Sequence, residues 1–152
     1  MGLTYKNILV AVDGSKEAEW AFKKSLEIAK RNNASIVLAH VIDTRTFATV
    51  EAYDRTIAER AEQFGKELME NYKKEAFEKG VTNVSYEIEY GSPKVKIPRD
   101  MAKKFNIDLI ICGATGLNMV ERFLIGSVSE HITRYAHCDV LVVRTDKEEE
   151  EE

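Results

Sequence analysis

The chain of 152 residues is 44% hydrophobic and 32% charged, which is the composition of an ordinary globular protein and enough for one domain with a sizeable core. Its formal net charge is −4, but residues 146–152 contribute −5, which leaves +1 for residues 1–145 and excludes the basic surface of a nucleic-acid-binding protein. No apolar run approaches the roughly 20 residues of a membrane span, and the first apolar run is too short for a signal peptide, so we expect a cytoplasmic protein.

Five short runs of the sequence are predicted to be β-strands. Four of them are nearly continuous in valine, isoleucine and leucine, which is typical of parallel strands that helices cover on both faces. These four runs are Asn7–Val12, Ser35–Val41, Ile107–Gly113 and Asp139–Arg144. The remaining run, Val84–Tyr90, alternates apolar and polar residues, so we place it at an edge of the sheet.

Helical patterns lie between these strands. The first helix is predicted to begin near Ser15, and the last to run from Ser127 to about Ala136. Between the second and third strands, apolar residues recur at spacings of three and four, which predicts a long amphipathic helix closed by Gly80. We interpret its apolar stripe as the face turned toward the core; it comprises Ile57, Ala61, Phe64, Leu68, Tyr72 and Ala76.

Two prolines complicate the helix before the fourth strand. Pro93 stands where a helix could begin, and Pro98 follows five residues later. Pro98 cannot donate a hydrogen bond to the carbonyl of Lys94, so an unbroken helix from Pro93 would lose a bond and be kinked. The sequence therefore predicts that the regular helix begins near Pro98.

The alternation of strands and helices predicts one doubly wound, mainly parallel sheet with helices on both faces. In such a sheet, ligands bind beyond the carboxyl ends of the strands, where the strand order reverses. In this sequence those ends are followed by Asp13–Gly14–Ser15, Val41–Ile42–Asp43, Gly91–Ser92 and residues 113–116. We expect a binding site among these segments.

The segment Gly113–Ser129 concentrates groups that suit a phosphate. Gly113 and Gly116 allow a ligand to approach the backbone closely, and Gly126–Ser127 opens a helix whose first amides lack internal partners. Hydroxyl groups of nearby residues, including Ser129, could add hydrogen bonds. The alternative is that the glycines only form turns and that Ser127 is an ordinary N-cap. Because neither a GxxxxGK[ST] nor a GxGxxG motif is present, a phosphate site here must depend on amides and hydroxyls.

The same spacing resembles a known protein family. Gly113, two residues, Gly116, nine residues and Gly126–Ser127 are similar to the G-2x-G-9x-G-[S/T] motif of the ATP-binding branch of the universal stress protein family. The resemblance continues in "ILVAVDGS", "LAHVID", "DLIICGATG" and "GSVSEHITRYAHCDVLVVR". It implies a Rossmann-like or flavodoxin-like α/β subunit with strand order 3-2-1-4-5 that binds ATP, commonly with a divalent cation.

The resemblance also implies roles for individual residues. Ala11, Val12 and Asp13 would line the nucleoside, and Val41 would hold the adenine through its main chain. The ribose and phosphates would be surrounded by Gly113, Gly116, Gly126, Ser127, Val128 and Ser129. The last strand, Val140 to Arg144, would pair with its symmetry mate in a homodimer.

Asp13 is the candidate ligand for Mg²⁺, because hard cations bind carboxylate and phosphate oxygens together. The alternative is that Asp13 forms the turn before Gly14. No catalytic base is evident, since His40, His131 and His137 suit structural or exposed positions, so we expect at most a slow ATPase.

The remaining expectations concern the thiols, the C-terminal tail and a rival function. Cys112 and Cys138 form no metal-binding pattern and are expected to be buried thiols. Residues 1–145 are expected to form the nucleotide-binding domain, and residues 146–152 an acidic, disordered tail. The rival function is a dimeric interaction module of the same fold that uses no nucleotide.

Overall fold

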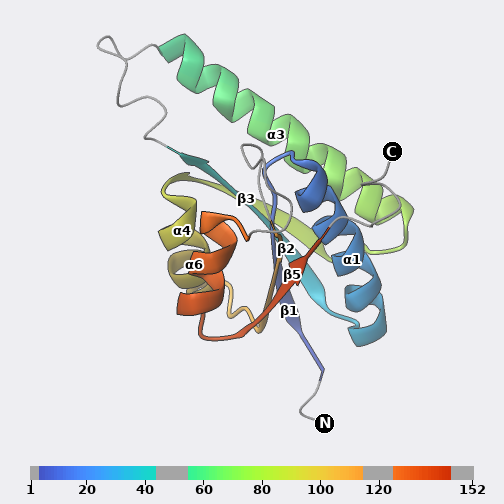
Figure 1. Cartoon of the computed structure of the whole chain (residues 1–152). Helices are drawn as coiled ribbons and strands as arrows, with labels where there is room; N and C mark the ends of the chain where they lie inside the picture. Colours follow the sequence, from blue (N-terminus) through green and yellow to red (C-terminus); the bar gives the residue numbers. More distant parts are fainter. Residues whose placement is uncertain (1–3, 44–54, 115–124, 145–152) are drawn as a thin grey trace, which may run out of the picture.

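The five predicted strands form one parallel sheet, as a computed structural model of the chain shows (Figure 1). The structure describes residues 4–43, 55–114 and 125–144. The strands are β1 (Asn7–Ala11), β2 (Ser35–Asp43), β3 (Val84–Gly91), β4 (Leu109–Gly113) and β5 (Asp139–Val143). Their order is β3-β2-β1-β4-β5 and every neighbouring pair is parallel, so the predicted fold class is confirmed.

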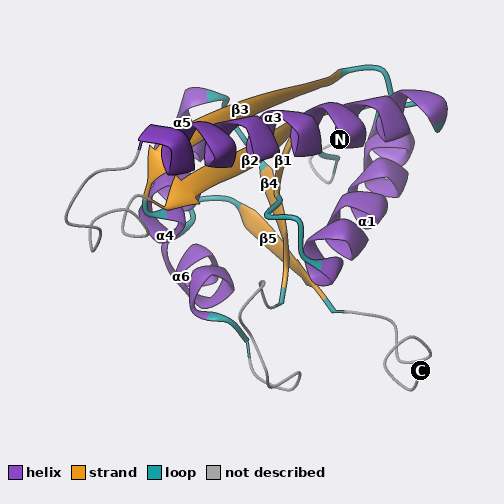
Figure 2. Cartoon of the chain, turned by 90° about the horizontal axis from the view of Figure 1, so that it is seen from above, coloured by secondary structure: helices purple, strands orange, loops and turns teal. Residues whose placement is uncertain are grey.

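Helices cover both faces of this sheet. One face carries α1 (Lys16–Asn32) and α3 (Arg55–Glu78). The other carries the consecutive segments α4 (Pro93–Val95), η1 (Lys96–Met101) and α5 (Ala102–Lys104), together with α6 (Ser127–Tyr135). Figures 1 and 2 show the strands between these two helical layers. Within the described ranges, no helix is both long enough and apolar enough to span a membrane.

The strands contribute side chains to two hydrophobic cores, one on each side of the sheet. Ile8 and Val10 of β1 face the α1 and α3 side, whereas Leu9 between them faces α6 and the helix after β3. The same alternation occurs along β4, where Ile111 joins the first core and Ile110 the second. Because both faces are buried, these strands need apolar side chains at every position, which explains their continuous runs of valine, isoleucine and leucine.

Strand β3 lies at the edge of the sheet, as its alternating sequence predicted. Tyr86 and Ile88 pack against the core beneath α1 and α3. On the opposite side, Glu87 forms an ion pair with Lys104 at 3.3 Å, and Glu89 forms one with Lys96 at 3.7 Å. The polar positions of the pattern therefore face a strip of charged residues rather than a core.

Helix α1 begins where the sequence indicates. The Ser15 hydroxyl accepts a hydrogen bond from the amide of Ala18 at 3.2 Å, so Ser15 is the N-cap. At the other end, Asn33 adopts φ 54° and its amide returns to the carbonyl of Ala29.

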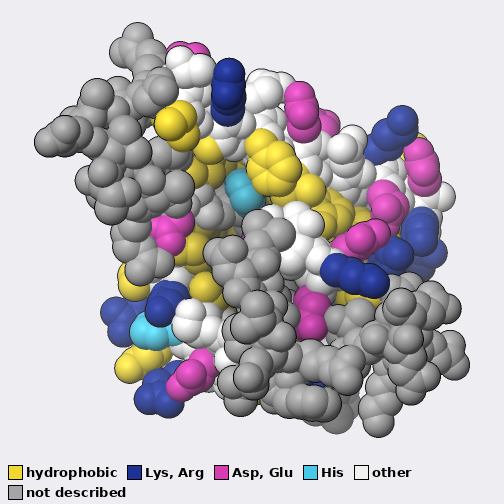
Figure 3. Space-filling model, turned by 45° about the horizontal axis from the view of Figure 1, so that its top comes forward, with side chains coloured by type: hydrophobic (Ala, Val, Ile, Leu, Met, Phe, Trp, Pro, Cys, Tyr) yellow, Lys and Arg dark blue, Asp and Glu magenta, His cyan; other side chains and the backbone are white. Residues whose placement is uncertain are grey.

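The predicted core stripe of α3 is wrong for the first half of the helix. Tyr72 and Ala76 are buried as expected, but Ile57 and Phe64 are 40% and 52% exposed. Phe64 is exposed although it lies over the sheet, because the neighbouring Gly65 packs against His40 of β2 and Ile88 of β3. In the space-filling view, hydrophobic side chains come to the surface beside charged ones along α3 (Figure 3).

The prediction that the helix before β4 begins near Pro98 is also wrong. The amides of Val95 and Lys96 already donate to the carbonyl of Ser92, so the helical path begins at Pro93. It continues through Pro98 as a π-helix, in which the Ala102 amide reaches the Ile97 carbonyl five residues earlier. The wider π turn accommodates the proline without ending the helix.

Candidate functional site

The candidate site lies at the carboxyl ends of β1 and β4. These strands are neighbours at the centre of the sheet, and the chain leaves them toward opposite edges, so the strand order reverses between them. Ligands of doubly wound sheets bind at this crevice. The residues next to it are the β1–α1 loop, the end of β4 and the start of α6 (Figure 1).

Asp13 shapes the β1–α1 loop. Its Oδ1 accepts a hydrogen bond from the amide of Ser15 at 2.9 Å, and Gly14 between them has φ +87°. This is the turn-forming role that the sequence left open for Asp13. A carboxylate that accepts one hydrogen bond still has lone pairs for a cation, so the turn and a role in Mg²⁺ binding are compatible.

The start of α6 is held against the end of β4. The Gly126 amide donates to the Ala114 carbonyl at 2.7 Å, and the Ser129 hydroxyl donates to the Gly113 carbonyl. Ser129 is buried, so its hydroxyl proton is used within the chain. Gly126 is the N-cap and Ser127 is the first helical residue, so the alternative of Ser127 as an N-cap is wrong. The hydroxyl of Ser127 is exposed beside the free amides of the first turn.

Gly113 has a packing role that the sequence did not indicate. A Cβ atom on Gly113 would lie 2.9 Å from the carbonyl carbon and 3.0 Å from the Cβ of Glu17, in the first turn of α1. Real Cβ atoms do not approach other atoms this closely. The glycine therefore lets α1 pack directly on the end of β4.

The main chain of Val41 faces the crevice. The Val12 amide donates to the Ala39 carbonyl at 3.0 Å, so Ala39 directs its peptide groups toward β1. Peptide groups alternate in direction along a strand, so those of Val41 point the same way. Because β1 ends at Ala11, opposite Ala39, the N–H and C=O of Val41 face the space beyond that strand.

The structure thus brings most of the predicted site residues to one end of the sheet. Ala11, Val12 and Asp13 end β1, Gly113 ends β4, and Gly126, Ser127, Val128 and Ser129 open α6. Gly116 lies outside the described residues, as does the tail 146–152. Which of these residues contact a nucleotide stays a prediction.

Tyr72 of α3 has carboxylates near enough to affect its pKa, Asp13 among them. Burial of Tyr72 raises the pKa of its phenol to about 12, and the carboxylates of Glu19, Asp13 and Glu75 raise this pKa further. In the described part of the chain, no three His, Cys, Asp or Glu side chains are arranged to hold a metal ion. A cation beside Asp13 would therefore take most of its ligands from phosphate oxygens or water.

The cysteines do not contribute a nucleophile. Burial raises the pKa of Cys112 to about 11, so its thiol is neutral at physiological pH. Cys138 is half-buried, and burial followed by the charge of Asp139 raises its pKa as well. The expectation of buried thiols holds for Cys112 and only partly for Cys138.

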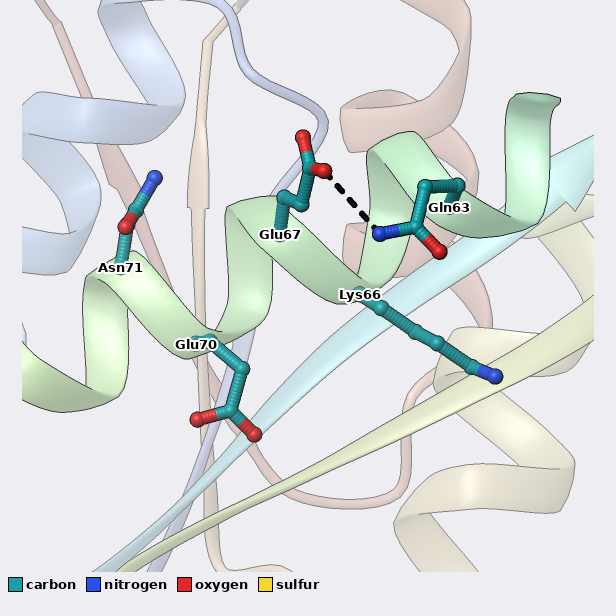
Figure 4. Close-up of a pocket in the computed structure, with 5 residues that line it drawn as sticks. All are labelled: Gln63, Lys66, Glu67, Glu70 and Asn71. Atoms are coloured by element: carbon teal, nitrogen blue, oxygen red, sulfur yellow. Dashed lines mark hydrogen bonds between the residues drawn. The ribbon is translucent and has the colours of Figure 1, made fainter.

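A groove of about 350 Å³ lies elsewhere, on the outer face of α3 (Figure 4). All five residues that line it come from this one helix, and the Gln63 amide donates to Glu67 at 3.0 Å. Charged side chains from a single exposed helix face do not converge on a ligand, so we do not assign a site to this groove.

The sequence also did not indicate which residue His40 contacts. It is buried, and its Nδ1 lies 3.0 Å from the carbonyl oxygen of Val12. The sequence indicated only a structural or exposed histidine, and the structural option is correct. No local pattern could have identified its partner, because the two residues meet across neighbouring strands.

Comparisons with known proteins agree with this geometry. The chain matches the model of the Universal stress protein family over residues 4–144. A protein of Staphylococcus haemolyticus (strain JCSC1435), named as a universal stress protein, is 54% identical over 145 residues, which are 95% of this chain and 88% of that protein. The solved structure of UspA from Lactobacillus plantarum is 33% identical to this chain, with a TM-score of 0.81. The match covers 94% of this chain and 100% of the UspA chain. A universal stress protein in complex with cAMP shares the fold, with a TM-score of 0.71 and 22% identity, over 94% of this chain and 99% of its own.

Proposed function

The chain belongs to the universal stress protein family, and we propose that it is an ATP-binding member whose nucleotide state regulates its interactions. One observation carries the proposal: the amino end of α6 is fixed against the end of β4, in the crevice that also contains the Asp13 loop and the Val41 main chain. A fixed helix amino end attracts phosphate through its free amides and its dipole.

Each part of ATP has a complementary group at this crevice. The N–H and C=O of Val41 suit the hydrogen-bonding edge of adenine, and the apolar Ala11 and Val12 suit the face of the nucleoside. The phosphates would lie at Gly126–Ser129, between Gly113 and α6, with Gly116 completing the glycine motif. The cAMP complex of a protein with this fold supports an adenine nucleotide as the ligand class.

We propose that the bound nucleotide regulates the protein rather than being a substrate for rapid hydrolysis. Rapid hydrolysis requires a group that orients water at the transferring phosphoryl. His40 is engaged with a main-chain carbonyl, and Ser129 with another. We therefore propose at most slow ATP hydrolysis, with Mg²⁺ held between Asp13 and the phosphates.

The functional unit that we propose is a homodimer formed through β5. This strand is an edge of the sheet, and the apolar side chains of Val140, Leu141 and Val142 are only half-buried in the single chain. Edge strands with free hydrogen-bonding groups pair readily with a second copy. The second candidate function, a dimer that uses no nucleotide, would keep this interface and lack the ATP response.

ATP should stabilise the protein in a thermal unfolding titration. At 100 times its dissociation constant, a ligand contributes about 2.7 kcal/mol, which corresponds to roughly 5–10 °C in a chain of this size. Ser127→Asp should abolish this shift, because a carboxylate at the start of α6 repels phosphate while it favours the helix dipole. Ser127→Asn is the neutral control and should retain the shift. A wild-type protein that adenine nucleotides do not stabilise would favour the nucleotide-free dimer.

The role of Asp13 in Mg²⁺ binding can be separated from its role in the turn. Asp13→Asn keeps an oxygen that can accept from the Ser15 amide but removes the charge that binds a cation. We expect Mg²⁺ to strengthen ATP binding about tenfold or more in the wild type and to have little effect in Asp13→Asn. Calorimetric titrations with and without Mg²⁺ measure this difference. An equal Mg²⁺ effect in both proteins would remove Asp13 from the cation site.

A further inference from the structure

His40 connects two parts of the molecule that the proposed function treats separately. Its Nδ1 lies 3.0 Å from the carbonyl oxygen of Val12, the residue before Asp13. A carbonyl oxygen can only accept a hydrogen bond, so Nδ1 carries the proton and donates it. Because His40 is 8% exposed, this bond is sheltered from water.

The other edge of the His40 ring lies against helix α3. A Cβ atom on Gly65 would lie 2.9 Å from Cδ2 and 3.3 Å from Nε2 of His40. Glycine is unfavourable inside a helix, yet this position has no room for a methyl group unless the ring moves. The ring thus fits between the Val12 carbonyl and the backbone of α3.

The neighbouring residue of α3 reaches the same loop. The Cζ of Phe64 would lie 3.3 Å from a Cβ atom on Gly14, and the Phe64 and His40 rings are 6.4 Å apart in an edge-on arrangement. Helix α3 therefore packs against the Asp13–Gly14 turn both through Phe64 and, indirectly, through His40.

We propose that His40 is a positioning residue for the β1–α1 loop. Its ring transmits the position of α3 to Val12 and Asp13. The proposal rests on the proposed ATP site, to which it adds a means of regulation. The Val12 carbonyl belongs to the peptide that joins Val12 to Asp13, so a shift of the ring reorients this peptide and the carboxylate beyond it. A displacement of α3 that moves the ring would therefore change the affinity for the nucleotide.

The first test compares two variants whose side chains have the same number of heavy atoms and the same branch at Cγ. His40→Asn places a side-chain N–H close to the position of Nδ1, whereas His40→Leu has no donor, and both remove the ring. We expect His40→Leu to weaken ATP binding about tenfold and His40→Asn to stay within about threefold of the wild type, a typical coupling between sites. Calorimetry on the folded full-length proteins measures this. Equal weakening by both variants would overturn the proposal, because loss of ring packing alone would then explain it.

The second test moves the ring from the side of α3. Gly65→Ala should weaken ATP binding, although alanine favours the helix, because its methyl group pushes on Cδ2 of His40. In a His40→Ala background the clashing Cδ2 is absent, so adding Gly65→Ala should cause no further weakening. If Gly65→Ala weakens ATP binding as much in the His40→Ala background as in the wild type, α3 does not act through His40.

A measurement without nucleotide separates this proposal from the ATP site. The ¹⁵N chemical shift of the Asp13 amide responds to the hydrogen bond on the preceding Val12 carbonyl. We expect it to change in His40→Leu and to stay near the wild-type value in His40→Asn. An unchanged shift in His40→Leu would overturn the positioning role, whereas a wild-type protein that binds no ATP would overturn the proposed function.

Discussion

Replacing Gly113 by valine is expected to lower the free energy of unfolding by about 3 kcal/mol or more, at the upper end of overpacking effects. The new Cβ would meet the carbonyl carbon of Glu17 at 2.9 Å, and this contact is with backbone, which cannot rotate away. To relieve it, α1 must move away from β4. The same movement would displace the Asp13 loop, so the variant should also lose the ATP response.

Two further variants make this prediction specific, with urea unfolding as the measurement. Gly126→Ser replaces another glycine of the motif. Gly126 is an N-cap with φ −66° and ψ 159°, a position that serine favours, so this variant should be nearly as stable as the wild type. Glu17→Ala should not rescue Gly113→Val, because the backbone and Cβ of residue 17 remain. A Gly113→Val protein as stable as the wild type would contradict the packing role of Gly113.

Phe22→Ala is expected to destabilise the protein by about 3–5 kcal/mol, the usual cost of removing a buried phenylalanine. Phe22 is fully buried, and its ring centroid is 4.6 Å from that of Tyr72. This contact joins α1 to α3, the two helices that flank the β1–α1 loop on one face of the sheet. For a chain of this size, the expected loss corresponds to roughly 6–20 °C in the unfolding midpoint.

The matched control is Phe77→Ala. It removes the same side chain from the end of α3, where Phe77 is 67% exposed, so the change should be within about 0.5 kcal/mol. Calorimetric unfolding of the two variants and the wild type gives both values. Similar losses in Phe22→Ala and Phe77→Ala would mean that α1 and α3 are not joined as the structure shows.

Much of the fold could be predicted because burial leaves a local record in the sequence. The continuous apolar run of β1 reflects a strand covered on both faces, and the alternation in β3 reflects an edge strand with Glu87 and Glu89 turned to charged neighbours. Two helix predictions were wrong for non-local reasons. The apolar spacing of Ile57 and Phe64 cannot reveal which turns of α3 the rest of the fold covers, and Pro98 is accommodated by a π turn that packing stabilises.

The candidate site was predictable in its location but not in its contacts. The carboxyl ends of β1 and β4 could be identified from the order of elements, and the glycine spacing pointed to the start of α6. The sequence left two roles open for Asp13, and the structure shows that it forms the turn, which is compatible with cation binding. It indicated a ligand hydroxyl at Ser129, yet in the structure this hydroxyl donates to Gly113.

The sequence by itself determined the number and type of the strands, the α/β alternation and the end of the sheet where a ligand would bind. These properties depend on local periodicity, which records which side of each element faces the core. Only the tertiary structure decided why Gly113 must lack a side chain and what His40 binds. The bond between His40 and Val12 joins residues 28 positions apart, and it requires β1, β2 and α3 to pack together. Contacts of this kind depend on the relative placement of elements, which no single segment of the chain encodes.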